Sequence, residues 1–179
     1  MTITIRWPGD LALTADVGAV KDPAATKQII IMSNTHIPLI SSGVAGPLGV
    51  LHLPRLWLKV SLECRGRLAE GYPGIGKGYD SMVIEALGLQ PEAVRSFIAE
   101  RRPTYPQFEA WIKAQPGVKL DKATLYKLNT AIQGYIHDDA TRRGILQANG
   151  LPDDGSVCPG AVDLNNLDDW HEFHQAALK

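Results

Sequence analysis

The sequence predicts a mainly α-helical fold, a compact bundle of about seven helices with a small β element at its N-terminus. Two observations carry this prediction. From Pro54 onward, apolar residues recur three and four positions apart, which places them on one face of a helix. The helical segments are separated by short stretches rich in Gly and Pro, so consecutive helices should pack as neighbours. The length of 179 residues suits a single domain over residues 1–179.

The predicted β element covers residues 1–35. Residues 2–7 (TITIRW) alternate polar and apolar side chains, which is the period of a half-buried strand, and residues 11–17 alternate again. Residues 28–32 (QIIIM) contain three consecutive isoleucines. Because β-branched side chains lose rotamer freedom in a helix, this run favours a strand.

A loop rich in Gly and Pro follows at residues 36–50 (HIPLISSGVAGPLGV), with three glycines and two prolines. Its remaining residues are mostly apolar, which is unusual for a solvated loop. An apolar loop normally lies against a core or lines a cavity, since it would otherwise form an exposed apolar patch. The loop is therefore expected to border a pocket.

Local start and stop signals place the helical bundle over residues 51–179. Pro at a first helical position and Asp, Asn or Thr at a cap position open helices, whereas Gly and Pro close them. Asp80, Thr104, Asp121 and Asp138 or Asp139 are the predicted caps within the bundle. The predicted helices cover about residues 54–69, 80–87, 91–102, 104–115, 121–136, 138–149 and 165–179.

The charge balance excludes several classes of partner. Lys and Arg number 18 and Asp and Glu number 19, a net charge of -1. Such a balance predicts no nucleic-acid partner and no anionic membrane surface. No run of roughly 18 apolar residues predicts a spanning helix. Cys64 and Cys158 lie far apart, and the first ten residues lack the pattern of a secretory signal, so a reducing, cytoplasmic setting is expected.

Residues 51–60 (LHLPRLWLKV) carry Leu-Pro-Arg and then, after three residues, Lys59. This pattern resembles a bacterial family classified as domain-of-unknown-function family 5069. The similarity continues through the Gly-Tyr at 71–72, the Ala-Leu-Gly-Leu at 86–89 and the Trp111 segment.

The resemblance covers about residues 50–135 and has one departure within its signature. The family usually has an acid directly before the Lys, and here that position is Leu58. The resemblance implies a mostly α fold and a bacterial, cytoplasmic setting. It implies no established activity, so no catalytic residue is carried over from it.

The helix that starts at Pro54 is predicted to be central. Arg55, Lys59, Glu63 and Arg67 recur every four residues and line one stripe, while apolar residues fill most of the remaining circumference. A helix so broadly apolar should lie in the core. On this basis three apolar side chains should be almost fully buried: Trp57, Leu58 and Leu62.

Arg55 and Lys59 lie near the N-terminal end of this helix, where the macrodipole is also positive. A negative partner should compensate, and two interpretations are open. The cations pair with acids on neighbouring helices, or they form a substrate-binding site for an anion, with Arg55 as a bidentate clamp and Lys59 as a point charge. The second interpretation predicts that Arg55→Gln leaves the ligand-free fold no less stable.

His52 is the best-placed candidate proton carrier. It comes three residues before Arg55 and directly after the apolar loop, and an unperturbed His has a pKa of about 6.5. The expected pocket lies between the loop at 36–50, the start of the Pro54 helix and residues 72–80. Tyr79 or Asp80 would assist catalysis and Tyr72 would help to bind substrate. No Ser-His-Asp arrangement follows from spacing alone.

Two other motifs could suggest a separate binding site, but neither is predicted to form one. The loop at 74–80 is rich in glycine but matches neither phosphate-binding pattern, so it is expected to be flexible or to cover the pocket as a lid. His171 and His174 on the last helix provide too few ligands for a metal, and His174 is expected on the buried face beside Trp170. The prediction is therefore no metal.

These observations favour a small bacterial enzyme without a bound organic cofactor. It would perform acid–base chemistry on an anionic small molecule, with His52, Tyr79 and Asp80 as catalytic residues. The alternative is a non-catalytic module that binds small molecules or oligomerises, and a homo-oligomer is left open in either case. A deep polar cavity at His52 favours the enzyme, whereas a flat apolar face with Arg55 paired to an internal acid favours the module.

Overall fold

The computed structural model describes residues 35–157 and 160–179. The chain divides into two units, Met1–Ser33 and Asn34–Lys179, and every helix named below belongs to the second unit. The predicted strands at 2–7, 11–17 and 28–32 lie outside the described residues, and the single-domain organisation stays a prediction.

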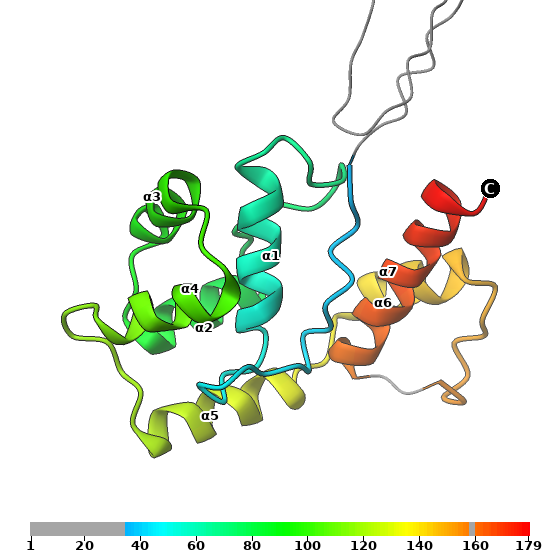
Figure 1. Ribbon diagram of the computed structural model, residues 1–179. Coiled ribbons are helices and arrows are strands. Elements are labelled where there is room, and N and C mark those ends of the chain that lie inside the picture. Colours follow the sequence, from blue (N-terminus) through cyan, green and yellow to red (C-terminus); the bar gives the residue numbers. More distant parts are fainter. Residues whose placement is uncertain (1–34, 158–159) are drawn as a thin grey trace, which may run out of the picture. The chain divides into compact units, whose positions relative to one another are not determined.

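Seven helices make up the described part of the chain, and the mainly α-helical class is confirmed (Figure 1). Between them the described residues form isolated β-bridges but no sheet. None of the described helices is both long enough and apolar enough to cross a bilayer. The helices are α1 (Leu53–Glu63), α2 (Tyr79–Leu87), α3 (Pro91–Arg101), α4 (Tyr105–Lys113), α5 (Lys122–Gln133), α6 (Asp139–Ala148) and α7 (Ala161–Ala177).

Helix α1 is the centre of the main core, as the sequence predicts. It packs against α2, α3 and α4, and Leu53, Leu56 and Val60 on its inner face have no exposed surface. The same inner face carries Arg55 and Lys59, which are also buried. The core therefore encloses a charged stripe as well as an apolar one.

The prediction that Trp57, Leu58 and Leu62 are almost fully buried is wrong, because all three are only partly buried. The reason is the rotation of α1 about its axis. With Arg55 and Lys59 turned inward, Trp57 and its neighbours move to the flank of the helix. The indole of Trp57 uses this position to donate its Nε1–H to the carbonyl of Pro103, at 3.1 Å.

Helix α1 also ends at Glu63, earlier than the predicted end near residue 69. Gly66 has a φ of 61°, in the left-handed region that stops helices. Beyond this turn, Leu68 forms a parallel bridge with His36. Residues 64–69, which were expected to be helical, instead form backbone hydrogen bonds with His36 near the start of the described residues.

Most predicted helix caps are confirmed. Thr104 and Gln107 form a capping box at α4, and Asp121 and Asp138 accept backbone N–H groups at the starts of α5 and α6. The exceptions are α2, whose cap position is Gly78, and α7, which begins at Ala161 rather than near residue 165. The carboxylate of Asp80 has other partners, described below.

A small second cluster lies beside the main core, formed by Ile145 and Leu146 of α6 and Leu164 of α7. Helix α7 contacts both α6 and α5. In the view of Figure 1 the loop at 36–50 passes between α1 and α7. Asp169 on the buried side of α7 reaches Arg55 on α1.

Candidate functional site

A cavity of about 250 Å³ lies where α1, α2 and α7 approach one another. We call it the polar cavity. The six site residues selected from the sequence all line it: His52, Arg55, Lys59, Tyr72, Tyr79 and Asp80. The other lining residues are Ser42, Pro73, Gly76, Lys77, Gly78, Asn165, Asp168 and Asp169. The expected location, between the apolar loop, the start of α1 and residues 72–80, therefore holds a polar-lined cavity.

His52 occupies an unusual backbone conformation at the N-cap of α1. Its φ of 65° and ψ of −18° lie in the left-handed region, which costs a residue with a Cβ on the order of 1 kcal/mol. The backbone compensates through two hydrogen bonds, since His52 N donates to Val44 O at 3.1 Å and its carbonyl accepts from Leu56 N at 2.9 Å. The conformation turns the imidazole toward α2 and the cavity wall.

The imidazole of His52 connects Ser42 with Asp80. Its Nε2 lies 2.8 Å from Asp80 Oδ1, and its Nδ1 lies 2.9 Å from Ser42 Oγ. Burial lowers the pKa of His52 below its usual 6.5, against the opposing effect of Asp80, so the ring is neutral near pH 7. The single N–H then belongs on Nε2, facing the carboxylate. This leaves Nδ1 as the acceptor for the Ser42 hydroxyl.

Asp80 is held as a carboxylate despite its burial. Burial alone raises its pKa, but the hydrogen bond from His52 and the charge of Lys59 outweigh this effect and leave the pKa below 3.8. Lys59 Nζ lies 2.5 Å from Oδ2, and the N–H of Gly76 donates to the same oxygen at 2.8 Å. Asp80 therefore fixes the imidazole, a lysine and the loop before α2 at once, which explains why it does not cap the helix.

Arg55 is fully engaged by partners within the chain. Its two terminal nitrogens lie 2.6 and 2.9 Å from the carboxylate oxygens of Asp169, a bidentate pair, and it also donates to the carbonyls of Pro38 and Ile40. Tyr72 donates its hydroxyl to Asp169 at 3.0 Å. The negative partners of Arg55 and Lys59 are thus Asp169 and Asp80, acids on neighbouring helices, which is the first of the two sequence interpretations.

The hydroxyls of both tyrosines, Tyr72 and Tyr79, are engaged in hydrogen bonds within the chain. Tyr79 donates its hydroxyl to the carbonyl of Ile132 at 3.1 Å, and burial raises its pKa to about 12. Burial and the neighbouring Asp169 likewise raise the pKa of Tyr72. Both hydroxyls stay protonated and bonded near pH 7. Tyr79 also packs its ring against His52, with ring centres 5.3 Å apart.

The loop at 74–80 forms one wall of the polar cavity and is fastened to the helices on both sides. The N–H of Gly74 donates to Glu63 at 3.0 Å, and Ser81 donates to the carbonyl of Gly76 at 2.9 Å. A Cβ at position 74 would lie 2.2 Å from a carboxylate oxygen of Glu63. The glycine at 74 thus serves close packing against α1, and not a phosphate cradle.

Sequence reasoning missed Ser42, Asp168 and Asp169 as site residues. Ser42 lies in the loop, ten residues before His52, and nothing in its sequence context separates it from Ser41. In the sequence, Asp168 and Asp169 stand near the predicted start of the last helix, where acids commonly complement the positive end of the macrodipole. Asp169 turns inward to Arg55, whereas Asp168 is partly buried and its pKa is raised by burial, Asp169 and Glu172.

The histidines of α7 do not face the core as expected. His174 and Trp170 are exposed, the latter by 61%, because the buried side of α7 is the one that carries Asp169 and Leu164. His171 is partly exposed and lies 3.3 Å from the side chain of Gln175. Within the described ranges, no three His, Cys, Asp or Glu side chains come together as metal ligands.

Comparison of the chain with family models, with curated proteins and with solved structures finds no match. The resemblance to family 5069 therefore stays a prediction. The case for a function rests on the geometry of the polar cavity.

Proposed function

We propose that the chain is a small enzyme that performs general acid–base chemistry in the polar cavity, with His52 as the proton carrier and no bound organic cofactor. One observation carries the proposal. A neutral, buried imidazole is held between a carboxylate and a hydroxyl at the wall of a cavity. Its backbone adopts a conformation that costs free energy, and such residues concentrate at functional sites.

The chain of hydrogen bonds from Ser42 through His52 to Asp80 favours acyl transfer as the reaction class. Ser42 would be the nucleophile. Ser42 Oγ would attack the carbonyl carbon of an ester while its proton passes to His52 Nδ1. Asp80 would stabilise the resulting imidazolium through Nε2–H. The same proton would then move to the leaving alcohol as the ester C–O bond breaks. A water would repeat both steps on the acyl-serine, releasing the acid and restoring the Ser42 hydroxyl.

The anionic substrate expected from the sequence needs a different cation from Arg55 or Lys59, because both are paired internally. Lys77 also lines the polar cavity, and its side chain is exposed. Its ammonium forms no ion pair within the described part of the chain. We therefore assign the attraction of an anionic small molecule to Lys77.

The test is hydrolysis of a panel of p-nitrophenyl esters of short, branched and aromatic acids, followed by absorbance. We expect Ser42→Ala and His52→Gln each to abolish the protein-catalysed rate, with the matched control His171→Gln unchanged. A fluorophosphonate probe should add one label, which mass spectrometry of peptides should locate at Ser42. Turnover that persists in both variants would refute the proposal.

The alternative is a non-catalytic module that binds a small molecule or oligomerises. It is favoured by the internal pairing of Arg55 and by the burial of Ser42, whose exposed fraction is 1%. Ligand binding without any ester turnover or serine labelling would support the module. The labelling experiment therefore separates the two functions even before a natural substrate is known.

A further inference from the structure

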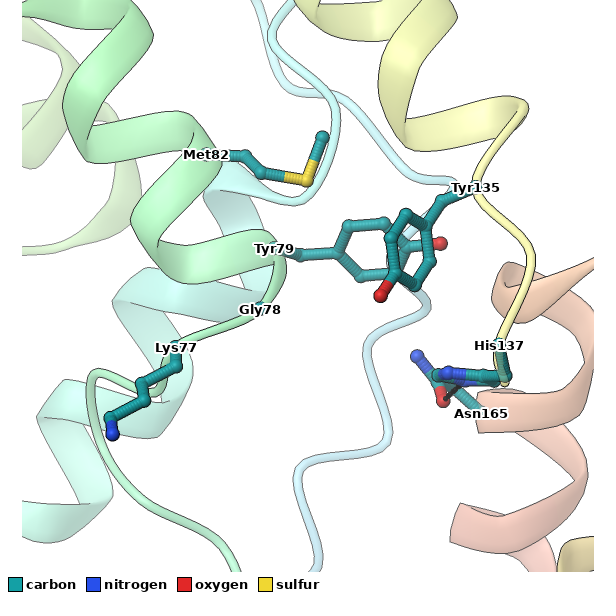
Figure 2. A pocket seen from close by; sticks show the side chains of 7 residues that line it. All are labelled: Lys77, Gly78, Tyr79, Met82, Tyr135, His137 and Asn165. Atoms are coloured by element: carbon teal, nitrogen blue, oxygen red, sulfur yellow. Dashed lines mark hydrogen bonds between the residues drawn. The ribbon is translucent and has the colours of Figure 1, made fainter. Parts of the chain in front are cut away.

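A second cavity of about 280 Å³ adjoins the polar cavity, and we call it the aromatic cavity (Figure 2). It shares Lys77, Gly78, Tyr79 and Asn165 with the polar cavity. Its own lining residues are Met82, Tyr135 and His137. The volume is close to the lower end of the range of small-molecule sites, roughly 300 Å³. The two cavities are therefore neighbouring parts of one binding region with different chemistry.

The walls of the aromatic cavity suit a flat apolar group. The rings of Tyr79 and Tyr135 meet edge to face, with centres 5.7 Å apart, and Tyr135 meets His137 in the same way at 5.8 Å. Figure 2 shows these rings beside the thioether of Met82. Aromatic rings and methionine sulfur both form favourable contacts with a further ring. Tyr135 is 48% exposed, so contact surface is available for a ligand.

The polar groups at the aromatic cavity are few and have distinct roles. His137 Nε2 lies 2.7 Å from Asn165 Oδ1, which fixes the imidazole as a wall. Lys77 is the only charged side chain among the described lining residues of this cavity. Figure 2 shows the Lys77 side chain extending away from the rings of Tyr79 and Tyr135, so its ammonium would reach a ligand in this cavity by rotation of its exposed, flexible stem. The combination selects an aromatic anion over a neutral ring or an aliphatic anion.

We infer that the aromatic cavity binds the ring of a small aromatic carboxylate, with the ring against Tyr79 and Tyr135 and the carboxylate at Lys77. His52 packs against Tyr79 with ring centres 5.3 Å apart, so a further group of such a ligand would extend toward Ser42. As a substrate class the inference rests on the proposed function. As a binding site it stands on the geometry of the cavity alone.

The experiment measures binding to the full-length chain by NMR titration with small probes. The probes are benzoate, phenylacetate, benzyl alcohol, benzylamine and acetate. We expect benzoate and phenylacetate to bind about threefold more tightly than benzyl alcohol, which is within the range that one exposed charge pair provides. Benzylamine and acetate should bind more weakly than either aromatic acid.

Two variants test the aromatic contact and the charge of the aromatic cavity separately. Tyr135→Ala should weaken every aromatic probe, whereas Lys77→Met should remove the preference for carboxylates and leave benzyl alcohol unchanged. The matched controls are Tyr126→Ala and Lys127→Met, which alter exposed residues of α5 outside both cavities. Both controls should bind all probes as the wild type does.

Three outcomes would overturn the inference: no binding of either aromatic acid, equal binding of benzoate and benzyl alcohol, or unchanged binding in Tyr135→Ala. Repeating the titration with Ser42→Ala separates the inference from the proposed function. Aromatic acids that bind this variant normally support the cavity whether or not the wild type hydrolyses esters. Turnover of esters without aromatic selectivity would support the enzyme and refute aromatic carboxylates as its substrate class, while the titration alone decides the binding site.

Discussion

Replacing Arg55 by glutamine tests the electrostatic structure of the site most directly. Arg55 is 6% exposed, and its guanidinium forms the bidentate pair with Asp169 at 2.6 and 2.9 Å. Glutamine removes the charge and leaves Asp169 buried without its partner. Breaking a buried pair in this way costs about 3–5 kcal/mol. The interpretation of Arg55 as part of an anion site predicts that this variant loses no stability. The structure instead predicts that Arg55→Gln lowers the free energy of unfolding.

The assay is thermal unfolding of the ligand-free protein. For a chain of this length, 1 kcal/mol shifts the melting temperature by about 2–4 °C, so Arg55→Gln should melt about 6–20 °C below the wild type. The double variant Arg55→Met, Asp169→Leu should recover part of this loss, because neither charge is then left alone.

Arg95→Gln is the matched control. Arg95 pairs with Glu63 at a site where both side chains are more than one third exposed, and such pairs contribute about 0–1 kcal/mol. A melting temperature of Arg55→Gln within about 1 °C of the wild type would refute the reasoning. An equal loss in the two arginine variants would show that burial of the Asp169 pair adds nothing.

Three further predictions follow from the described contacts. Leu56→Ala, at a fully buried position of α1, should cost about 2–5 kcal/mol in denaturant unfolding, and Leu62→Ala, which is only partly buried, should cost clearly less. The free energy of unfolding should fall as the pH drops below about 6.5, because the unfolded chain binds a proton at His52 and the folded chain does not. His52→Gln should therefore make the melting temperature less dependent on pH between about pH 7 and 5. Asp168→Asn should raise the melting temperature at neutral pH, because burial and Asp169 disfavour the charge of the Asp168 carboxylate. The gain should vanish as the pH falls toward 3.8, because the wild-type carboxylate then becomes protonated.

Local rules predicted much of the fold. Caps such as Thr104 and Asp121 act through hydrogen bonds within three residues, so they can be recognised without knowing the tertiary structure. The rotation of α1 could not be predicted this way. Its apolar residues cover most of the circumference, and only the partners Asp80 and Asp169, remote in sequence, decide that Arg55 and Lys59 turn inward.

The sequence predicted where the polar cavity lies and several of the residues that line it. A histidine, two cations and an acid near one helix start are visible in the sequence, and the structure places them at one cavity. The hydrogen bond of Ser42 was not predictable, because it depends on the left-handed backbone of His52, a conformation that only a few per cent of non-glycine residues adopt. The pairing of Arg55 with Asp169 spans too many residues for any spacing rule.

The separation of Arg55 and Asp169 has a consequence for how the protein is made. The two residues are 114 positions apart, and α7 follows the other described helices in the order of synthesis. While the ribosome is still translating the segments between them, the guanidinium has no carboxylate from α7 to receive it. A nascent chain that already contains α1 to α5 therefore carries an uncompensated positive charge in its developing core. Translation of α7 would supply this carboxylate and complete the polar cavity.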